Sequence, residues 1–264
     1  MRRQIPTKMI NAAWVLLAAM LFVAQPVFAQ SAHVNAARGK SALYVFNRTK
    51  LELARKMALV DPKRMAQLEA WRQADEAAIA ALQSLGFKVT LADEHSAIQT
   101  TRGQDLVLIS ESVDALEIGT KYRNLDIPLV DMENDLLADL GMTGQKNGRD
   151  YGTDENQRFL WMVNAPHPLS AGLAAGIQNV IDDEHFKMNW GKPGLGAITI
   201  ATLRGEPDKA AIFAYERGAT MNDETLAPAR RVSLFIWQDV FTHLRPEGRS
   251  LFDAAALWAV GISR

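Results

Sequence analysis

The segment Asp105-Leu-Val-Leu-Ile-Ser110 decides the fold class, because it is strongly apolar, short and followed at once by polar residues. Such a run is typical of a strand buried on both faces of a parallel sheet. A helix is predicted after it at residues 115–122. The next predicted strand is 127–131, and the next helix is 133–140, closed by Gly141. Strands and helices that alternate in this way indicate an α/β domain with a mostly parallel central sheet covered on both faces.

The same alternation extends toward the N-terminus. Residues 41–46 and 87–91 are strand-like apolar runs, and residues 49–60 are compatible with a short helix. Asp61 followed by Pro62 is the arrangement of an N-cap and a proline at the first helical position. Gly86 is predicted to end the helix that begins there. The apolar residues of this helix recur every three or four positions, at Leu68, Trp71, Ala74, Ala78, Leu82 and Leu85.

The second half of the chain is richer in strand signals. Gly205-Glu-Pro207 separates two of these strands, which indicates an antiparallel hairpin between residues 197 and 215. Residues 144–156 are predicted to be a loop, and a last helix stops at Gly261. No repeat or linker divides the chain, so a single domain is expected over residues 41–261. The predicted strands of this half are 158–163, 179–181, 197–202, 210–215 and 231–236.

The first 29 residues have the layout of a secretory signal peptide. Basic residues at positions 2, 3 and 8 precede an apolar stretch at 9–24, Pro26 and the small-residue site Val27-Phe-Ala29. The stretch is shorter than the roughly 20 residues that span a bilayer, which favours cleavage over an uncleaved anchor. The sequence therefore predicts export to the periplasm or the medium, a flexible leader at 30–40, and no stable membrane anchor after cleavage.

The overall composition excludes several classes of protein. The 264 residues carry a formal net charge of -1 and no run of Lys or Arg, which argues against a nucleic-acid partner. There is no cysteine, so the chain forms no disulfide and has no lipid-anchor thiol. No motif calls for a cofactor or a metal; the segment Asp182-Asp-Glu-His185 is interpreted as a solvated acidic turn.

A set of short blocks resembles a group of secreted bacterial domains related to class I glutamine amidotransferases and to the trehalose-utilisation type. The resemblance spans roughly residues 41–261, and it implies a flavodoxin-like sheet in a protein often linked to polysaccharides. The blocks are Leu85-Gly-Phe-Lys-Val-Thr-Leu91, Asp105-Leu-Val-Leu-Ile-Ser-Glu-Ser112, Pro128-Leu-Val-Asp-Met-Glu133, Leu140-Gly-Met142, His167-Pro-Leu-Ser-Ala-Gly-Leu173, Ile212-Phe-Ala-Tyr-Glu-Arg-Gly218, Ala227-Pro-Ala-Arg-Arg231 and Leu251-Phe-Asp-Ala-Ala-Ala-Leu-Trp-Ala259.

The departure from true amidotransferases is informative. Their chemistry needs a cysteine thiolate and a late His-x-Glu pair, whereas this chain has no cysteine and none of its five histidines is followed two residues later by glutamate. Glutamine hydrolysis by that mechanism is therefore excluded.

The candidate site lies where two predicted strands end. Ser110, Glu111 and Ser112 follow one strand, and Asp131 and Glu133 follow the next. Ligands of open parallel sheets bind beyond the carboxyl ends of the strands, so these five residues are expected to border one cleft. The alternative is that their oxygen atoms cap the helices that follow.

Two functions remain open at this stage. The first is an exported, non-catalytic binding or accessory domain for carbohydrate, cell-envelope material or another protein. The second is a hydrolase with a non-standard site made of Ser112, His167 and Asp131. The absence of a strong catalytic motif favours the first, and His167 is equally compatible with a structural role in its turn.

Overall fold

The computed structural model describes residues 34–49, 52, 56 and 61–262. The predicted signal peptide and most of the helix predicted at 49–60 lie outside these residues. Residues 34–40, expected to be a flexible leader, instead form turns that pack on the end of the first long helix. The Ala37 N–H donates to Leu85 O at 2.8 Å, and Ala37 is fully buried.

The first part of the chain, together with one late strand, builds the parallel half of one mixed sheet. Its strands are β1 (Ser41–Val45), β2 (Lys88–Ala92), β3 (Leu106–Ile109), β4 (Leu129–Asp131) and β11 (Arg231–Ser233). They lie in the order β2-β1-β3-β4-β11, and every neighbouring pair is parallel. The chain therefore moves outward from β1 to β2 and then crosses back to β3, so that strand order reverses between β1 and β3.

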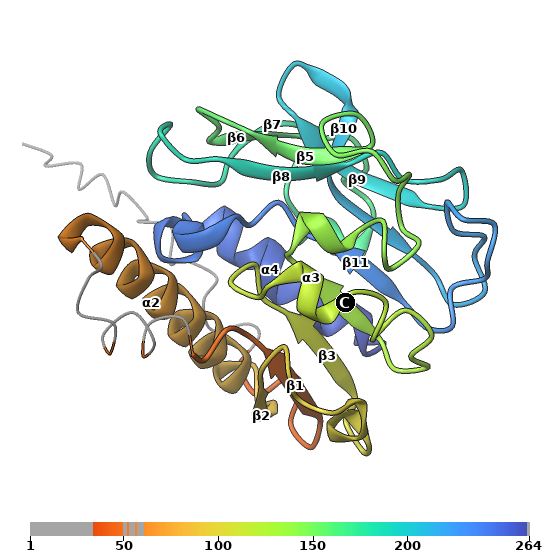
Figure 1. Cartoon of the computed structure of the whole chain (residues 1–264). Helices are drawn as coiled ribbons and strands as arrows, with labels where there is room; N and C mark the ends of the chain where they lie inside the picture. The colour runs from red at the N-terminus through yellow and green to blue at the C-terminus, as the bar shows by residue number, and fades with distance from the viewer. Residues whose placement is uncertain (1–33, 50–51, 53–55, 57–60, 263–264) are drawn as a thin grey trace, which may run out of the picture.

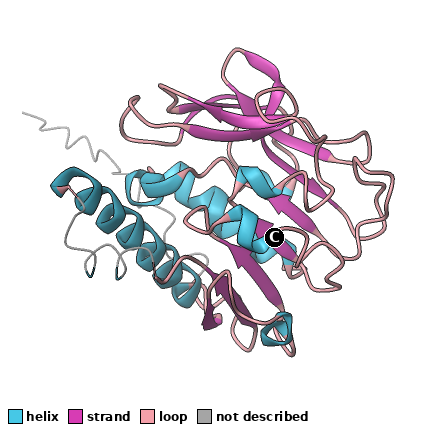
Figure 2. Cartoon of the chain, viewed as in Figure 1, coloured by secondary structure: helices cyan, strands magenta, loops and turns pink. Residues whose placement is uncertain are grey.

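The rest of the sheet is antiparallel. The hairpin predicted between residues 197 and 215 is confirmed, and further strands extend the sheet from it to the edge strand β7. The segment 144–156, predicted as a loop, contains a strand that pairs with β8. These strands are β10 (Glu206–Tyr215), β9 (Ile198–Leu203), β6 (Phe159–Met162), β7 (Gly176–Asn179), β8 (Met188–Gly191) and β5 (Tyr151–Asp154). Figure 2 shows this part of the molecule as strands and loops, with the long helices gathered elsewhere.

Two long helices, α2 (Pro62–Ser84) and α4 (Pro246–Ala259), are present (Figure 1). The Asp61 carboxylate accepts the Arg64 N–H at 2.8 Å, as the predicted N-cap requires, and Gly86 follows the helix with φ +95°. The other helices are short: α3 (Ala115–Ile118), and the 3-10 helices η2 (Ile98–Thr101), η3 (Asn134–Leu136), η4 (Pro168–Ser170) and η5 (Gln238–His243).

The two helices predicted at 115–122 and 133–140 are much shorter than expected. Gly119 adopts φ +48° and stops α3 after one turn, and residues 133–140 contain only η3 and turns. Apolar spacing could not reveal this, because these segments still point apolar side chains at the sheet while closing as turns.

Alternation along the strands gives the sheet two cores. Leu106 and Leu108 of β3 pack toward α2 and α4, whereas Val107 and Ile109 pack on the opposite face, under the short helices and loops. Both faces are covered, as expected of parallel strands, but the two long helices lie on the same face.

Candidate functional site

Two cavities open at the carboxyl ends of the parallel strands. The switch-point cavity, of about 270 Å³, lies where strand order reverses and is lined by Phe46, Asn47, Arg48, Glu52, Leu68, Trp71, Arg72, Asp75, Glu76, Ile79, Leu91 and Ser112. The polar cavity, of about 280 Å³, is lined by Trp71, Glu111, Val113, Glu133, Asn134, Asp135, Asn147, Thr153, Trp237 and Gln238. Trp71 of α2 lines both cavities, so its indole forms their common wall.

A buried polar network forms the floor of the switch-point cavity. Asp75 of α2 is 4% exposed and accepts the Tyr44 hydroxyl of β1 at 2.8 Å and the hydroxyl of Ser110. Ser110 Oγ lies 3.2 Å from Ser112 Oγ, which accepts the Asn47 N–H at 3.1 Å. A continuous chain of hydrogen bonds thus joins α2 to the ends of β1 and β3.

The Asp75 carboxylate has no basic partner among the described residues. Burial raises the pKa of Asp75 from its ordinary value to about 6. Hydrogen bonds from Ser110, Ser112 and Tyr44 favour the ionised form but do not overcome burial, and the neighbouring Glu76 adds repulsion. Asp75 is therefore a carboxyl group that gains or loses its proton in a mildly acidic range.

Two carboxylates that line the polar cavity accept hydrogen bonds from backbone N–H groups. Glu133 accepts the Asp135 N–H at 2.9 Å, and Glu111 accepts the Gln238 N–H at 2.8 Å. Gln238 adopts a left-handed φ of +41°, which is uncommon for a residue other than glycine. The carboxylate of Glu111, from the loop after β3, thus fixes a strained turn at the start of η5.

Asp131 lies beneath this edge rather than in either cavity. It is 1% exposed; one carboxylate oxygen accepts the Glu133 N–H at 3.3 Å, and the other has no hydrogen-bond partner. Burial raises the pKa of Asp131 well above its ordinary value, and the negative charge of Glu133 raises it further. The carboxyl group of Asp131 is therefore neutral over a wider pH range than an exposed one.

The five predicted ligand-binding residues gather at one edge but do not share one cleft. Ser112 lines the switch-point cavity, whereas Glu111 and Glu133 line the polar cavity. Ser110 and Asp131 line neither, because both point into the packed layer below. The single expected cleft is thus two cavities on either side of Trp71.

His167 lies far from this edge. It precedes η4, accepts the Leu169 N–H on Nδ1 at 3.2 Å and packs against Trp258, with ring centres 5.5 Å apart. Trp258 in turn lies under the guanidinium of Arg230, the residue just before β11. His167 therefore sits at the amino edge of the parallel strands, and the Ser112, His167 and Asp131 arrangement considered for a hydrolase is not assembled.

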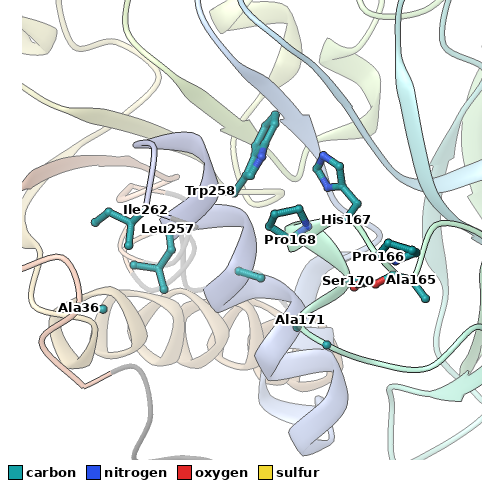
Figure 3. Close-up of a pocket in the computed structure, with 12 residues that line it drawn as sticks. Ala36, Ala165, Pro166, His167, Pro168, Ser170, Ala171, Leu257, Trp258 and Ile262 are labelled. Atoms are coloured by element: carbon teal, nitrogen blue, oxygen red, sulfur yellow. Dashed lines mark hydrogen bonds between the residues drawn. The ribbon is translucent and has the colours of Figure 1, made fainter. Parts of the chain in front are cut away.

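The cavity beside His167 is apolar (Figure 3). It encloses about 300 Å³ between η4 and the end of α4, and it is lined by Ala36, Ala165, Pro166, His167, Pro168, Ser170, Ala171, Gly172, Ala254, Leu257, Trp258 and Ile262. Burial lowers the pKa of His167, and the nearby Arg230 lowers it further against the opposing effect of Glu216. A neutral imidazole that fixes its own turn is a structural element, as the sequence allowed.

The described residues offer no preformed metal centre and no membrane span. No group of three or more His, Asp or Glu side chains gathers there as metal ligands. No helix of the described chain is both long and apolar enough to cross a bilayer.

Sequence reasoning missed three residues of this edge: Asp75, Tyr44 and Trp237. A signal for Asp75 was present, because Leu68, Trp71, Asp75, Ala78 and Leu82 follow one another at alternating intervals of three and four. A carboxylate inside an apolar helical stripe indicates a buried polar contact. Trp237 follows β11, and it lies at the site because β11 pairs with β4 in the sheet. The spacing of residues along the sequence does not reveal that pairing.

Comparison with known proteins shows distant structural neighbours. The sequence matches no family model and no curated protein. A provisional GMP synthase subunit of Thermoplasma acidophilum is 13% identical, with a TM-score of 0.49 over 84% of this chain and 94% of that chain. A provisional ThuA-like protein of Bacteroides uniformis is 10% identical, with a TM-score of 0.46 over 84% and 91%. The mmIFT52 N-terminal domain is 12% identical, with a TM-score of 0.47 over 84% and 98%. All three have TM-scores below 0.5 at low identity, a level of similarity that carries no argument about this chain.

Proposed function

We propose that the chain is an exported, non-catalytic binding domain whose ligand is a carbohydrate or other hydroxyl-rich cell-envelope material. The ligand occupies the polar cavity and contacts Trp71 and Trp237. The proposal of export rests on the signal-peptide layout of residues 1–29.

The strand order supports a flavodoxin-like assignment for the parallel half. The order β2-β1-β3-β4-β11 follows the flavodoxin pattern when β11 is counted as the fifth parallel strand. In that pattern the ligand crevice lies beyond the carboxyl ends of the strands flanking the reversal. Both cavities described above lie at this edge, so the topology and the cavities favour the same location.

One observation carries the proposal: two tryptophans border a cavity whose other walls, apart from Val113, are carboxylate, amide and hydroxyl groups. The lining of this cavity is mostly polar, and an indole adds both an apolar ring and an N–H donor, so the cavity suits a ligand rich in hydroxyl groups. Trp71 is half-buried and packs in a small cluster with Leu68 and Met65, separate from the main core, and it extends from that cluster to the cavity. Asn134, Asn147 and Thr153 supply groups that both donate and accept hydrogen bonds, as ligand hydroxyls require.

The site does not favour hydrolysis. Ser112 Oγ is engaged by the Asn47 N–H and lies next to Ser110, and the nearest carboxylate of the network is Asp75. In the recurrent serine sites the base that activates the nucleophile is a histidine or a lysine, whereas the base available here is a buried carboxyl group. Histidine does not line either cavity among the described residues. Binding is therefore the better supported of the two functions.

Calorimetric titration tests the proposal. The purified protein is titrated with chitin oligosaccharides, soluble peptidoglycan fragments and maltohexaose. We expect saturable binding of at least one of these glycans and a loss of about tenfold or more in affinity for Trp71→Ala and Trp237→Ala.

Trp161→Ala is the matched control, because Trp161 is an exposed indole in the antiparallel half of the sheet. It should leave the affinity unchanged. Absence of binding to every glycan, or equal affinity of all three variants and the unaltered protein, would contradict the proposal.

A further inference from the structure

The antiparallel half carries a row of exposed apolar side chains. Trp161 on β6 is paired with Ile177 on β7, so both side chains point to the same side of the sheet. They are 45% and 50% exposed, and Val163, at the next alternate position beyond β6, is 49% exposed. Single exposed apolar residues are ordinary, but a contiguous group marks an interaction site. Trp161, Val163 and Ile177 are called the β6–β7 patch below.

Two arginines give one end of this patch a positive charge. The guanidinium carbons of Arg158 and Arg204 lie 5.1 and 5.2 Å from the centre of the Phe159 ring, so the ring is flanked by both. Arg158 also donates to Asn179 Oδ1 at 3.4 Å. Neither arginine forms an ion pair with a carboxylate of the described chain. The surface is thus apolar at Trp161 and cationic at Phe159.

The patch adjoins an open sheet edge. β7 pairs with β6 on one side and with no other named strand of the described chain on the other. The chain directly beyond β7 is bonded, because the Asp182 N–H donates to His243 O and the Arg245 N–H donates to Val180 O, so the open edge is that of β7 itself. Its sequence, Gly176-Ile-Gln-Asn179, contains no charged residue and no proline, the usual means of protecting an edge strand. An extended chain can add to such an edge through backbone hydrogen bonds.

We propose that the β6–β7 patch and the open edge of β7 bind an extended acidic segment of a partner protein. The segment adds to β7 as a further strand. Its apolar side chains pack on Trp161 and Ile177, and its carboxylates pair with Arg158 and Arg204 at the Phe159 end. An anionic membrane surface would satisfy the same charges but would leave the strand edge unused, so the edge favours a peptide.

The probe is a fluorescein-labelled synthetic peptide, Val-Thr-Val-Thr-Asp-Thr-Asp, whose one strand face reads Val, Val, Asp, Asp. Binding to the whole protein is followed by fluorescence anisotropy. We expect saturable binding that falls about tenfold or more in the double variant Arg158→Glu with Arg204→Glu, and similarly in Trp161→Ser. The double Arg-to-Lys variant should retain most of the affinity, and Leu116→Ala, at an exposed position of α3, should retain all of it.

Three results would overturn the proposal. One is the absence of saturable binding up to millimolar peptide. Another is equal binding of an analogue that is N-methylated at every peptide bond, since it cannot supply the backbone N–H donors of an added strand. The third is tighter binding to phosphatidylglycerol vesicles than to the peptide, lost in the same variants, which would assign the patch to a membrane surface. Circular dichroism of each variant separates loss of binding from loss of folding.

Discussion

The two edges of the parallel strands differ in the partners of their carboxylate groups. At the amino edge, Lys40 Nζ lies 3.0 Å from Asp105, and Arg230 Nε lies 2.7 Å from Glu216. At the carboxyl edge, Asp75 and Asp131 are buried with hydroxyl or N–H partners and with no cation among the described residues. The amino edge compensates these carboxylates with opposite charge, whereas the two buried carboxylates of the carboxyl edge have none. Glu76, which is more exposed, does pair with Arg72 there.

This difference separates a structural edge from a functional one. Burying a carboxylate without a cation costs stability, whereas an ion pair at the surface costs little and stabilises a little. Natural proteins accept such local costs mainly at functional sites. The proposed function therefore assigns binding to the carboxyl edge, with its two cavities, and a structural role to the amino edge.

The largest expected contrast is between the tryptophans of the two edges. Trp258 is 3% exposed and packs on His167 and Arg230, so Trp258→Ala should lower the free energy of unfolding by about 3–5 kcal/mol. Trp71 is only half-buried, so Trp71→Ala should cost about 1 kcal/mol. Urea denaturation at neutral pH measures the free energy of unfolding of both variants. Similar losses of free energy for the two would contradict the distinction between the edges.

The next effect is a pH dependence of opposite sign at the two edges. The raised pKa of Asp75, about 6, means that the folded state holds its proton more tightly than the unfolded state. The contribution of Asp75 to the free energy of unfolding is then fully present below the unfolded pKa of about 4. This contribution, on the order of 3 kcal/mol, is lost as pH rises through about 6. Asp75→Asn should abolish this decline, as followed by denaturation from pH 4 to pH 7.

Asp105 at the amino edge is the matched control. Partial burial alone would raise the pKa of Asp105, but the Ser41 N–H and Lys40 outweigh it and hold the pKa below its ordinary value. Its contribution to stability is present above the unfolded pKa and is lost as pH falls through the lower folded pKa. Asp105→Asn should therefore destabilise the protein at neutral pH but not at strongly acidic pH. The same sign of pH dependence in both variants would contradict the comparison.

The smallest effect is expected for an exposed ion pair. Glu216→Gln removes the charge that faces Arg230, a pair whose side chains are 44% and 27% exposed. Such pairs stabilise by at most about 1 kcal/mol and are screened by salt. We expect a small loss of thermal stability at low ionic strength that disappears in about 1 M salt. A loss that persists at high salt would show that the pair acts through packing instead.

The sequence predicted the strands better than the helices. Buried strands such as β3 are short apolar runs with few alternatives, and the β9–β10 hairpin has a clear turn signal at Gly205. The helices predicted at 115–122 and 133–140 failed because apolar spacing does not separate a helix from a chain of turns. Trp71 has its place in the apolar pattern of α2, which is typical of a buried residue, but its side chain reaches the cavities at the edge of the sheet.

The candidate site was predicted only in outline. Ser112, Glu111 and Glu133 reach the expected edge because the carboxyl ends of parallel strands must share it. Their division between two cavities depends on how α2 crosses the strands, which no local pattern encodes. His167 was considered as a partner for Ser112 by residue type alone, and the topology places it at the opposite edge.

The indole N–H resonances test the central claim most directly, because tryptophans mark both edges and the antiparallel half. The protein is titrated with the glycan that binds most tightly, and the ¹⁵N–¹H signals are assigned by single substitutions. The signals of Trp71 and Trp237 should shift, while those of Trp161, Trp190 and Trp258 should stay in place. Shifts confined to the Trp258 signal would show that the ligand binds at the amino edge, and they would contradict the assignment of function to the carboxyl edge.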